Sequence, residues 1–108
     1  MKAILLPRFG GPEVLTITPS VPTPEPKPGH ATIHIKAFGI NHAEMHMRRG
    51  EWAEFMPIIG IECVGIIVSC PGGEFTQGTP VAALMGGLGR TINGSFMQSI
   101  QVRLWGIL

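Results

Sequence analysis

The stretch Pro57-Ile58-Ile59-Gly60-Ile61-Glu62-Cys63-Val64-Gly65 opens a nearly continuous apolar run that continues to Ser69. Many of its residues are β-branched, which favours a strand buried in the protein over an exposed one. Glycines inside such a strand mark points where the strand bends or where another backbone comes close. The run therefore predicts a buried strand over residues 58–69.

Glu62 is the acidic side chain inside this run, and a buried charge needs a partner. A structural ion pair with Arg48 or Arg49 is the favoured interpretation, and either arginine satisfies it. The alternative places Glu62 at the edge of a cleft, where it would contact a ligand.

On both sides of this run, glycine and proline divide the chain into short β-rich segments. Residues 1–6 and 13–18 are expected to pair as a hairpin across Phe9-Gly10-Gly11-Pro12, and the proline-rich segment 19–28 to cross the fold without regular structure. Residues 30–38 alternate, with Ala31, Ile33, Ile35 and Ala37 on the inner face and Thr32, His34 and Lys36 on the outer face. Further strands are expected over 81–85 and 95–102, the second after a hairpin turn at Asn93-Gly94.

A short helix is expected from Asn41 to Gly50. Asparagine is a preferred N-cap, and Glu44 stands three residues later, where its carboxylate can accept a hydrogen bond from the cap amide. On this helix His42 and His46 are four residues apart and share a face, which is the spacing of a two-histidine metal clamp. Two ligands do not complete a metal site, so solvated histidines are the favoured interpretation.

Composition excludes several functions. The net charge is +1 and no basic run occurs, so nucleic acid is not an expected partner. No run of apolar residues is long enough to span a membrane, and the expected location is the cytoplasm. Cys63 and Cys70 are expected to be reduced, because an extended segment would hold them about 23 Å apart.

Four motifs, in order, resemble the N-terminal half of the medium-chain dehydrogenase/reductase superfamily, and most of all its zinc-independent quinone oxidoreductase branch. They are Met1-Lys2-Ala3-Ile4, Phe38-Gly39-Ile40-Asn41-His42-Ala43-Glu44, Pro57 to Gly65, and Phe75-Thr76-Gln77-Gly78-Thr79-Pro80-Val81. The zinc enzymes of this superfamily hold their catalytic metal at the positions of Asn41 and Ile61. Neither side chain suits zinc, so the resemblance implies a reductase scaffold without a metal.

The resemblance implies a mainly β fold, a GroES-like, partly open β-barrel with one or two short helices. It implies that Asn41 lies beside the nicotinamide and the substrate, and that His46 replaces a tyrosine that lines the substrate cleft. His46 would then donate a hydrogen bond to a carbonyl oxygen, although a surface histidine without this role is at least as well supported. Asn41 and His46 are the predicted catalytic residues, with Glu62 as a further substrate contact.

The length of 108 residues predicts a single domain, residues 1–108, whereas members of this superfamily have two. The segment Gly86-Gly87-Leu88-Gly89 lacks the third glycine and the following helix of a dinucleotide-binding loop. NADPH is therefore expected from a Rossmann domain outside this chain.

The leading hypothesis is the substrate half of a quinone or enone reductase, inactive alone. The alternative is a non-catalytic binding or assembly module left by truncation, whose apolar tail 103–108 either packs on the barrel or supports a homo-oligomer. A third hypothesis is the metal site at His42 and His46.

Overall fold

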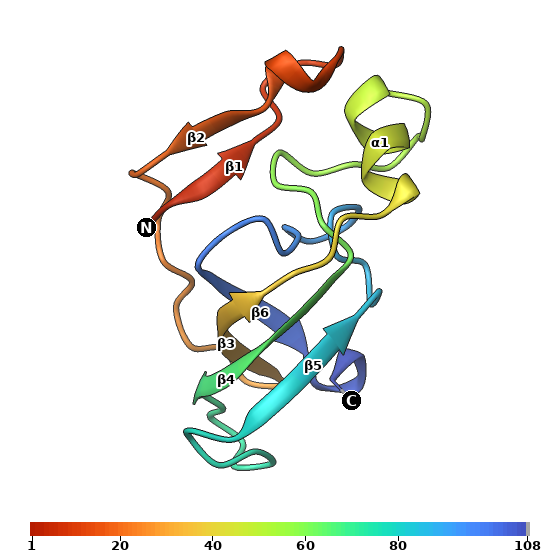
Figure 1. Ribbon diagram of the computed structural model, residues 1–108. Helices are drawn as coiled ribbons and strands as arrows, with labels where there is room; N and C mark the ends of the chain where they lie inside the picture. The colour runs from red at the N-terminus through yellow and green to blue at the C-terminus, as the bar shows by residue number, and fades with distance from the viewer. Residues whose placement is uncertain (108) are drawn as a thin grey trace.

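The computed structural model describes residues 1–107 and contains two antiparallel sheets and one α-helix. Figure 1 shows the two-stranded sheet and the helix at one end of the molecule and the four-stranded sheet at the other. The strand orders are β1-β2 and β5-β4-β3-β6, and neither sheet closes on itself. The predicted mainly β, partly open fold with a short helix is confirmed.

The elements follow the expected order with shifted boundaries. The strands are β1 (Ala3–Leu5), β2 (Thr16–Thr18), β3 (His30–Ala37), β4 (Glu62–Ser69), β5 (Pro80–Leu84) and β6 (Ser99–Arg103). The helix is α1 (His42–Arg49), and two short 3₁₀ turns cover Pro12–Val14 and Leu104–Gly106.

The predicted N-terminal hairpin is confirmed, since Ala3 lies opposite Thr18 and Leu5 opposite Thr16. Its strands are only three residues long. The link between them forms a 3₁₀ turn that begins at Pro12, because proline fixes a backbone angle that suits a helical start.

The core forms on the inner face of β3, β4 and β6. Ile33, Ile67 and Ile100, one from each strand, are at most 1% exposed, and Met47 of α1 is completely buried. Thr32 was expected on the outer face but is also buried. The proline-rich segment passes near this position, because the backbone carbonyl of Glu25 accepts a hydrogen bond from Gln101, the residue opposite Thr32 on β6.

The prediction of a strand beginning at Ile58 was wrong, because β4 begins at Glu62. Gly60 has a φ of 114°, which interrupts an extended strand. The carbonyls of Ile58, Ile59 and Gly60 instead accept hydrogen bonds from the amides of residues 94, 96 and 95. The same contacts exclude the expected hairpin turn at Asn93-Gly94.

The C-terminal residues return to the free edge of the four-stranded sheet. Ile107 forms an antiparallel bridge with Ala83 of β5, and Gly106 is buried. Trp105 points away and is 69% exposed. The tail therefore packs on the sheet as far as Ile107, while its tryptophan stays on the surface; Leu108 lies outside the described residues.

No helix among the described residues has both the length and the apolar character needed to cross a membrane. Both cysteines are free, as expected, with Cys63 buried in β4 and Cys70 half-buried.

The Cys63 thiol is expected to make unfolding strongly pH-dependent in alkaline solution. Burial raises the pKa of Cys63 from 9.0 to about 11, a backbone hydrogen bond at Ala83 opposes this in part, and the Glu62 charge adds to it. The unfolded chain then loses this proton first as pH rises, so the stabilisation is complete below pH 9 and is lost toward pH 11.

We expect the free energy of unfolding to fall by about 2 kcal/mol across this interval, measured by urea denaturation. Cys63→Ala should remove this slope, while Cys70→Ala should keep it. An identical slope in both variants would contradict the assignment to Cys63.

Candidate functional site

Asn41 stands at the start of α1 in the geometry of an N-cap. Its backbone is extended, its amide donates to Glu44 Oε2 at 3.2 Å, and its side-chain Nδ2 donates to Glu44 Oε1 at 3.4 Å. Gly50 ends the helix in the left-handed conformation, as the sequence predicts. The bond from Nδ2 is long and therefore weak, so this group remains available to a better acceptor.

A pocket of about 320 Å³ opens in front of Asn41, between the N-terminal hairpin, α1 and the segment around Ile59. Its wall is mostly apolar, and its polar groups come from α1 and its cap. The lining includes Leu15, Phe38, Asn41, Glu44, Ile59 and Phe96. A wall of this kind, with few polar groups, is typical of a small-molecule site.

Glu44 is only 3% exposed, although a carboxylate is costly to bury. No basic side chain among residues 1–107 lies within 4.0 Å of it. Arg48, one helical turn away, instead donates to the Gly10 carbonyl and ties α1 to the hairpin. Glu44 therefore orients Asn41 through two hydrogen bonds, a role that the sequence predicted only for the cap amide.

His46 lies outside the Asn41 pocket and belongs to a group on the surface. Its Nδ1 is 3.3 Å from Glu51 Oε1, and its ring stacks on Trp52 with centroids 5.8 Å apart. Arg90 lies over the same indole at 5.8 Å and pairs with Glu54 at 2.7 Å. We call these five residues the Trp52 cluster.

Glu51, Trp52, Glu54 and Arg90 of this cluster line a hollow of about 380 Å³, and His46 lies beside it without lining it. Sequence reasoning missed it, because Arg90 reaches Trp52 from 38 residues away and no local pattern links them. The structure thus separates the two predicted catalytic residues, because Asn41 lines the pocket and His46 lies outside it, in the Trp52 cluster.

The expected ion pair of Glu62 was wrong. Arg48 donates to Gly10, and Arg49 approaches Glu51 at 3.8 Å. The Glu62 side chain packs against Gly39 instead, where any added side chain would collide with its carboxylate. Glu62 is half-buried and lies near the segment that leads into Asn41, but it does not line the Asn41 pocket.

The residues at the two positions of the zinc site do not fit a zinc ion. Ile61 packs on the core, offers no lone pair from its side chain, and accepts a hydrogen bond from Met85 through its carbonyl. The Asn41 amide nitrogen is not a zinc ligand. Elsewhere in residues 1–107, no group of three histidine, cysteine or acidic side chains is arranged to hold a metal ion, and His46 faces Glu51 and Trp52.

Residues 27–106 match the family model described as the alcohol dehydrogenase GroES-like domain. The chain belongs to this family. The resemblance to the N-terminal domain of medium-chain dehydrogenase/reductases is thereby confirmed. This GroES-like domain is 33% identical over 76 residues to a quinone oxidoreductase of Pongo abelii, with 67% of the chain and 23% of the relative covered. It is 34% identical over 82 residues to an alcohol dehydrogenase of Rhizobium meliloti (strain 1021), with 71% and 22% covered.

Solved structures have the same fold as this domain. A Pseudomonas syringae quinone oxidoreductase matches 99% of the GroES-like domain with a TM-score of 0.85 and 26% identity, and 32% of that protein is covered. A mycobacterial protein complexed with NADPH matches 99% with a TM-score of 0.83 and 25% identity, and 31% of it is covered. The GroES-like domain therefore spans less than a quarter of the two curated relatives and about a third of these two structures.

Proposed function

We propose that this GroES-like domain is the substrate half of an NADP(H)-dependent, zinc-independent reductase of quinones or enones. The observation that carries the proposal is the Asn41 carboxamide at an apolar pocket. The resemblance described above implies that the zinc enzymes of the superfamily hold their metal at the positions of Asn41 and Ile61. The oxidoreductase relatives support the reaction class. The substrate, the cofactor and the roles of the residues are part of the proposal.

The cofactor is assigned to a Rossmann domain outside this chain. Within residues 1–107 the glycine-rich segment 86–89 is a loop followed by an irregular segment, whereas pyrophosphate binding needs a helix N-terminus there. NADPH, when bound by that domain, supplies the hydride. The similarity to a protein complexed with NADPH supports this cofactor.

Asn41 has the chemistry to replace a metal as the group that polarises the acceptor. Its Nδ2 would donate to the carbonyl oxygen as negative charge develops there, while Glu44 holds the side chain in orientation. The apolar wall excludes water and suits a flat quinone or enone. A hydrogen-bond donor is a weaker device than zinc, so electron-poor acceptors are the expected substrates.

His46 and Glu62 are proposed to assist substrate binding without polarising the acceptor. The Trp52 cluster offers an aromatic and charged rim on which the distal part of a substrate can rest, with His46 as one donor. Glu62 shapes the approach to Asn41 through Gly39. A cytoplasmic location is also proposed, in keeping with the two free thiols.

The isolated chain is expected to show no saturable binding of NADPH up to millimolar concentration, measured by fluorescence titration. It should not oxidise NADPH with a quinone, because half of a two-domain cleft cannot align hydride and acceptor. Joined to the cofactor domain of the Pseudomonas syringae quinone oxidoreductase, it should restore turnover. Micromolar binding of NADPH or turnover by the isolated chain would contradict the assignment of the cofactor to another domain. Absence of turnover in every two-domain assembly would favour the non-catalytic binding or assembly module.

A further inference from the structure

Two segments that are distant in the chain cross at Asn93-Gly94. The Gly94 amide donates to the Ile58 carbonyl at 2.7 Å, and the next two amides donate to carbonyls of the same segment 58–60 at 3.2 and 3.1 Å. Gly94 is buried, and the residue after it, Ser95, has no exposed surface. The backbone at Gly94 is therefore held by three successive hydrogen bonds and shielded from water.

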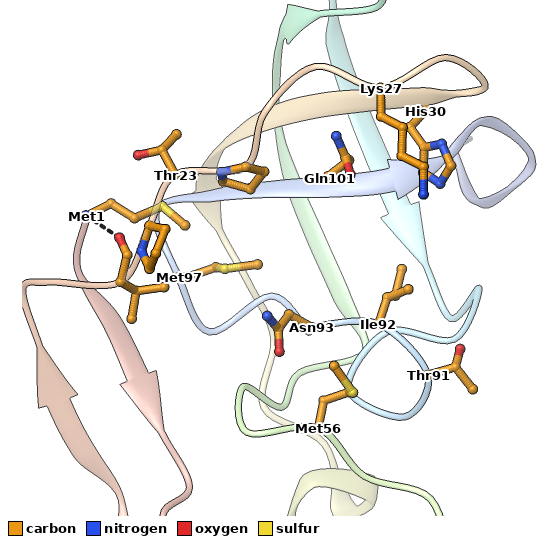
Figure 2. A pocket seen from close by; sticks show the side chains of 13 residues that line it. Met1, Thr23, Lys27, His30, Met56, Thr91, Ile92, Asn93, Met97 and Gln101 are labelled. Carbon is orange, nitrogen blue, oxygen red and sulfur yellow. Dashed lines mark hydrogen bonds between the residues drawn. The ribbon is translucent and has the colours of Figure 1, made fainter.

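The crossing has no room for further atoms. A Cβ atom at Gly94 would fall on the Ile59 carbonyl group and on the Gly60 oxygen. Figure 2 shows the Asn93 side chain at the wall of a cavity of about 390 Å³ beside the proline-rich segment. Its Oδ1 atom is buried and accepts no hydrogen bond from residues 1–107. A carboxylate in place of this amide would put a charge on an oxygen to which no protein group donates.

The pair Asn93-Gly94 also carries a reactive arrangement of atoms, because the Gly94 nitrogen can attack the side-chain carbonyl carbon of Asn93. Glycine offers the least hindrance to this attack, since it has no Cβ atom. The Gly94 nitrogen loses its proton and bonds to Asn93 Cγ, the bond from Cγ to Nδ2 breaks, and Nδ2 leaves as ammonia. Water then opens the resulting succinimide ring at either carbonyl group, which yields aspartate or isoaspartate with no change of oxidation state.

The folded protein hinders the first step of this reaction. The attacking nitrogen must lose a proton that is hydrogen-bonded to the Ile58 carbonyl, and the anion that forms would be buried. A closed succinimide ring would also leave the Gly94 nitrogen without a proton, so it could not donate to Ile58. The reaction thus needs segments 58–60 and 94–96 to separate first, as they do in local unfolding.

We propose that Asn93-Gly94 is a site of spontaneous deamidation that opens with this crossing, and that the modification prevents the crossing from forming again. Isoaspartate adds a backbone carbon and a carboxylate next to Gly94, where even a Cβ atom falls on the Ile59 backbone. Aspartate adds a charge at the buried oxygen of residue 93. A transient opening therefore becomes irreversible, because the modified chain leaves the folding equilibrium. This inference does not depend on the proposed reduction of quinones.

The site is tested by incubating the folded chain and the chain unfolded in guanidinium chloride at the same mildly alkaline pH. Peptide mapping by mass spectrometry measures deamidation, and an isoaspartyl methyltransferase assay detects isoaspartate. We expect the unfolded chain to react at Asn93 at least about 100-fold faster than the folded chain. Asn41 is the internal control, because the side chain of His42 hinders the same attack. Equal rates at Asn93 in the two states, or a rate in the unfolded chain no higher than at Asn41, would overturn the proposal.

The role of the crossing is tested in the folded chain, at denaturant concentrations too low to unfold it. Deamidation at Asn93 and hydrogen exchange of the Ser95 and Phe96 amides should accelerate by the same factor, because both follow separation of the same two segments. Deamidation that does not follow this exchange would show that Asn93 reacts while the crossing is closed, and the proposal would fail.

Irreversibility is tested by diluting the denaturant after incubation, with a reductant present so that Cys63 and Cys70 stay free. Chains that refold should contain intact Asn93, and chains that remain unfolded should carry aspartate or isoaspartate at this position. The matched control is the same chain held equally long in denaturant at mildly acidic pH, where the Gly94 nitrogen keeps its proton, and it should refold fully. Modified chains recovered in the refolded fraction in their starting proportion would show that the crossing tolerates the change and would overturn the proposal.

Discussion

Gly94→Ala is expected to destabilise the protein by at least about 3 kcal/mol, enough to unfold a large fraction of a domain of this size. A methyl group at this position would fall on backbone atoms of Ile59 and Gly60, whose carbonyls accept hydrogen bonds from the amides of Phe96 and Ser95. Backbone cannot rotate away as a side chain can, so the two segments must separate. Urea denaturation measures the loss as a lower midpoint.

Gly106→Ala is the matched control. It also adds one methyl group at a buried glycine with negative φ, but the nearest atom, Gly86 Cα, is 4.0 Å away. Its stability should stay within about 0.5 kcal/mol of the wild type. Similar midpoints for the Gly94 variant and the wild type would mean that segments 58–60 and 94–96 do not cross as described.

The crossing at Gly94 also builds the proposed substrate pocket. Ile59 and Phe96 belong to the two crossing segments, and both line the Asn41 pocket. Phe96 also packs on Phe38, with ring centroids 4.7 Å apart. Stability and the shape of the pocket therefore depend on the same close approach of two backbones.

Signals that act within one turn of the chain were sufficient to predict α1. Asn41, Glu44 and Gly50 stand at cap positions, and the structure uses all three in these roles. The order of the strands along the chain followed equally from alternation and from the turn residues. The family resemblance added the fold and the position of the site.

Errors arose where contacts come from distant parts of the chain. Apolar composition alone extended β4 back to Ile58, whereas Gly60 and its hydrogen bond with Ser95 end the extended conformation there. Thr32 alternated as an outer-face residue but is buried, and a distant segment passes near its neighbour Gln101. The local pattern marked Gly60 as a bend but did not show that the strand begins only after it, and it gave no sign of the segment that passes near Thr32.

Charged side chains were the least predictable part of the site. Arg48 and Arg49 were the expected partners of Glu62, but Arg48 donates to a carbonyl and Arg49 approaches a different glutamate. Conversely, Glu44 was predicted only as the partner of the cap amide, and its burial was not foreseen. Long side chains choose among many partners within reach, so spacing alone does not determine their pairs.

Asn41→Ser is expected to reduce kcat of the two-domain assembly about 100-fold, as is typical when one donor to a developing oxyanion is removed. Serine is as good an N-cap as asparagine, so α1 and the free energy of unfolding should change little. Its shorter side chain does not reach the position of Nδ2. The change therefore separates the two roles of this residue, which alanine would remove together.

The size of the loss should depend on the acceptor, and this dependence is the stronger test. A benzoquinone is electron-poor and needs little polarisation, whereas a simple enone needs a donor at its carbonyl oxygen, so the enone should lose more of its kcat. His34→Ala on β3, outside every hollow described above, should leave both rates unchanged. If the Asn41 variant keeps its rate with both acceptors, Asn41 acts only as the helix cap that its hydrogen bonds to Glu44 already describe.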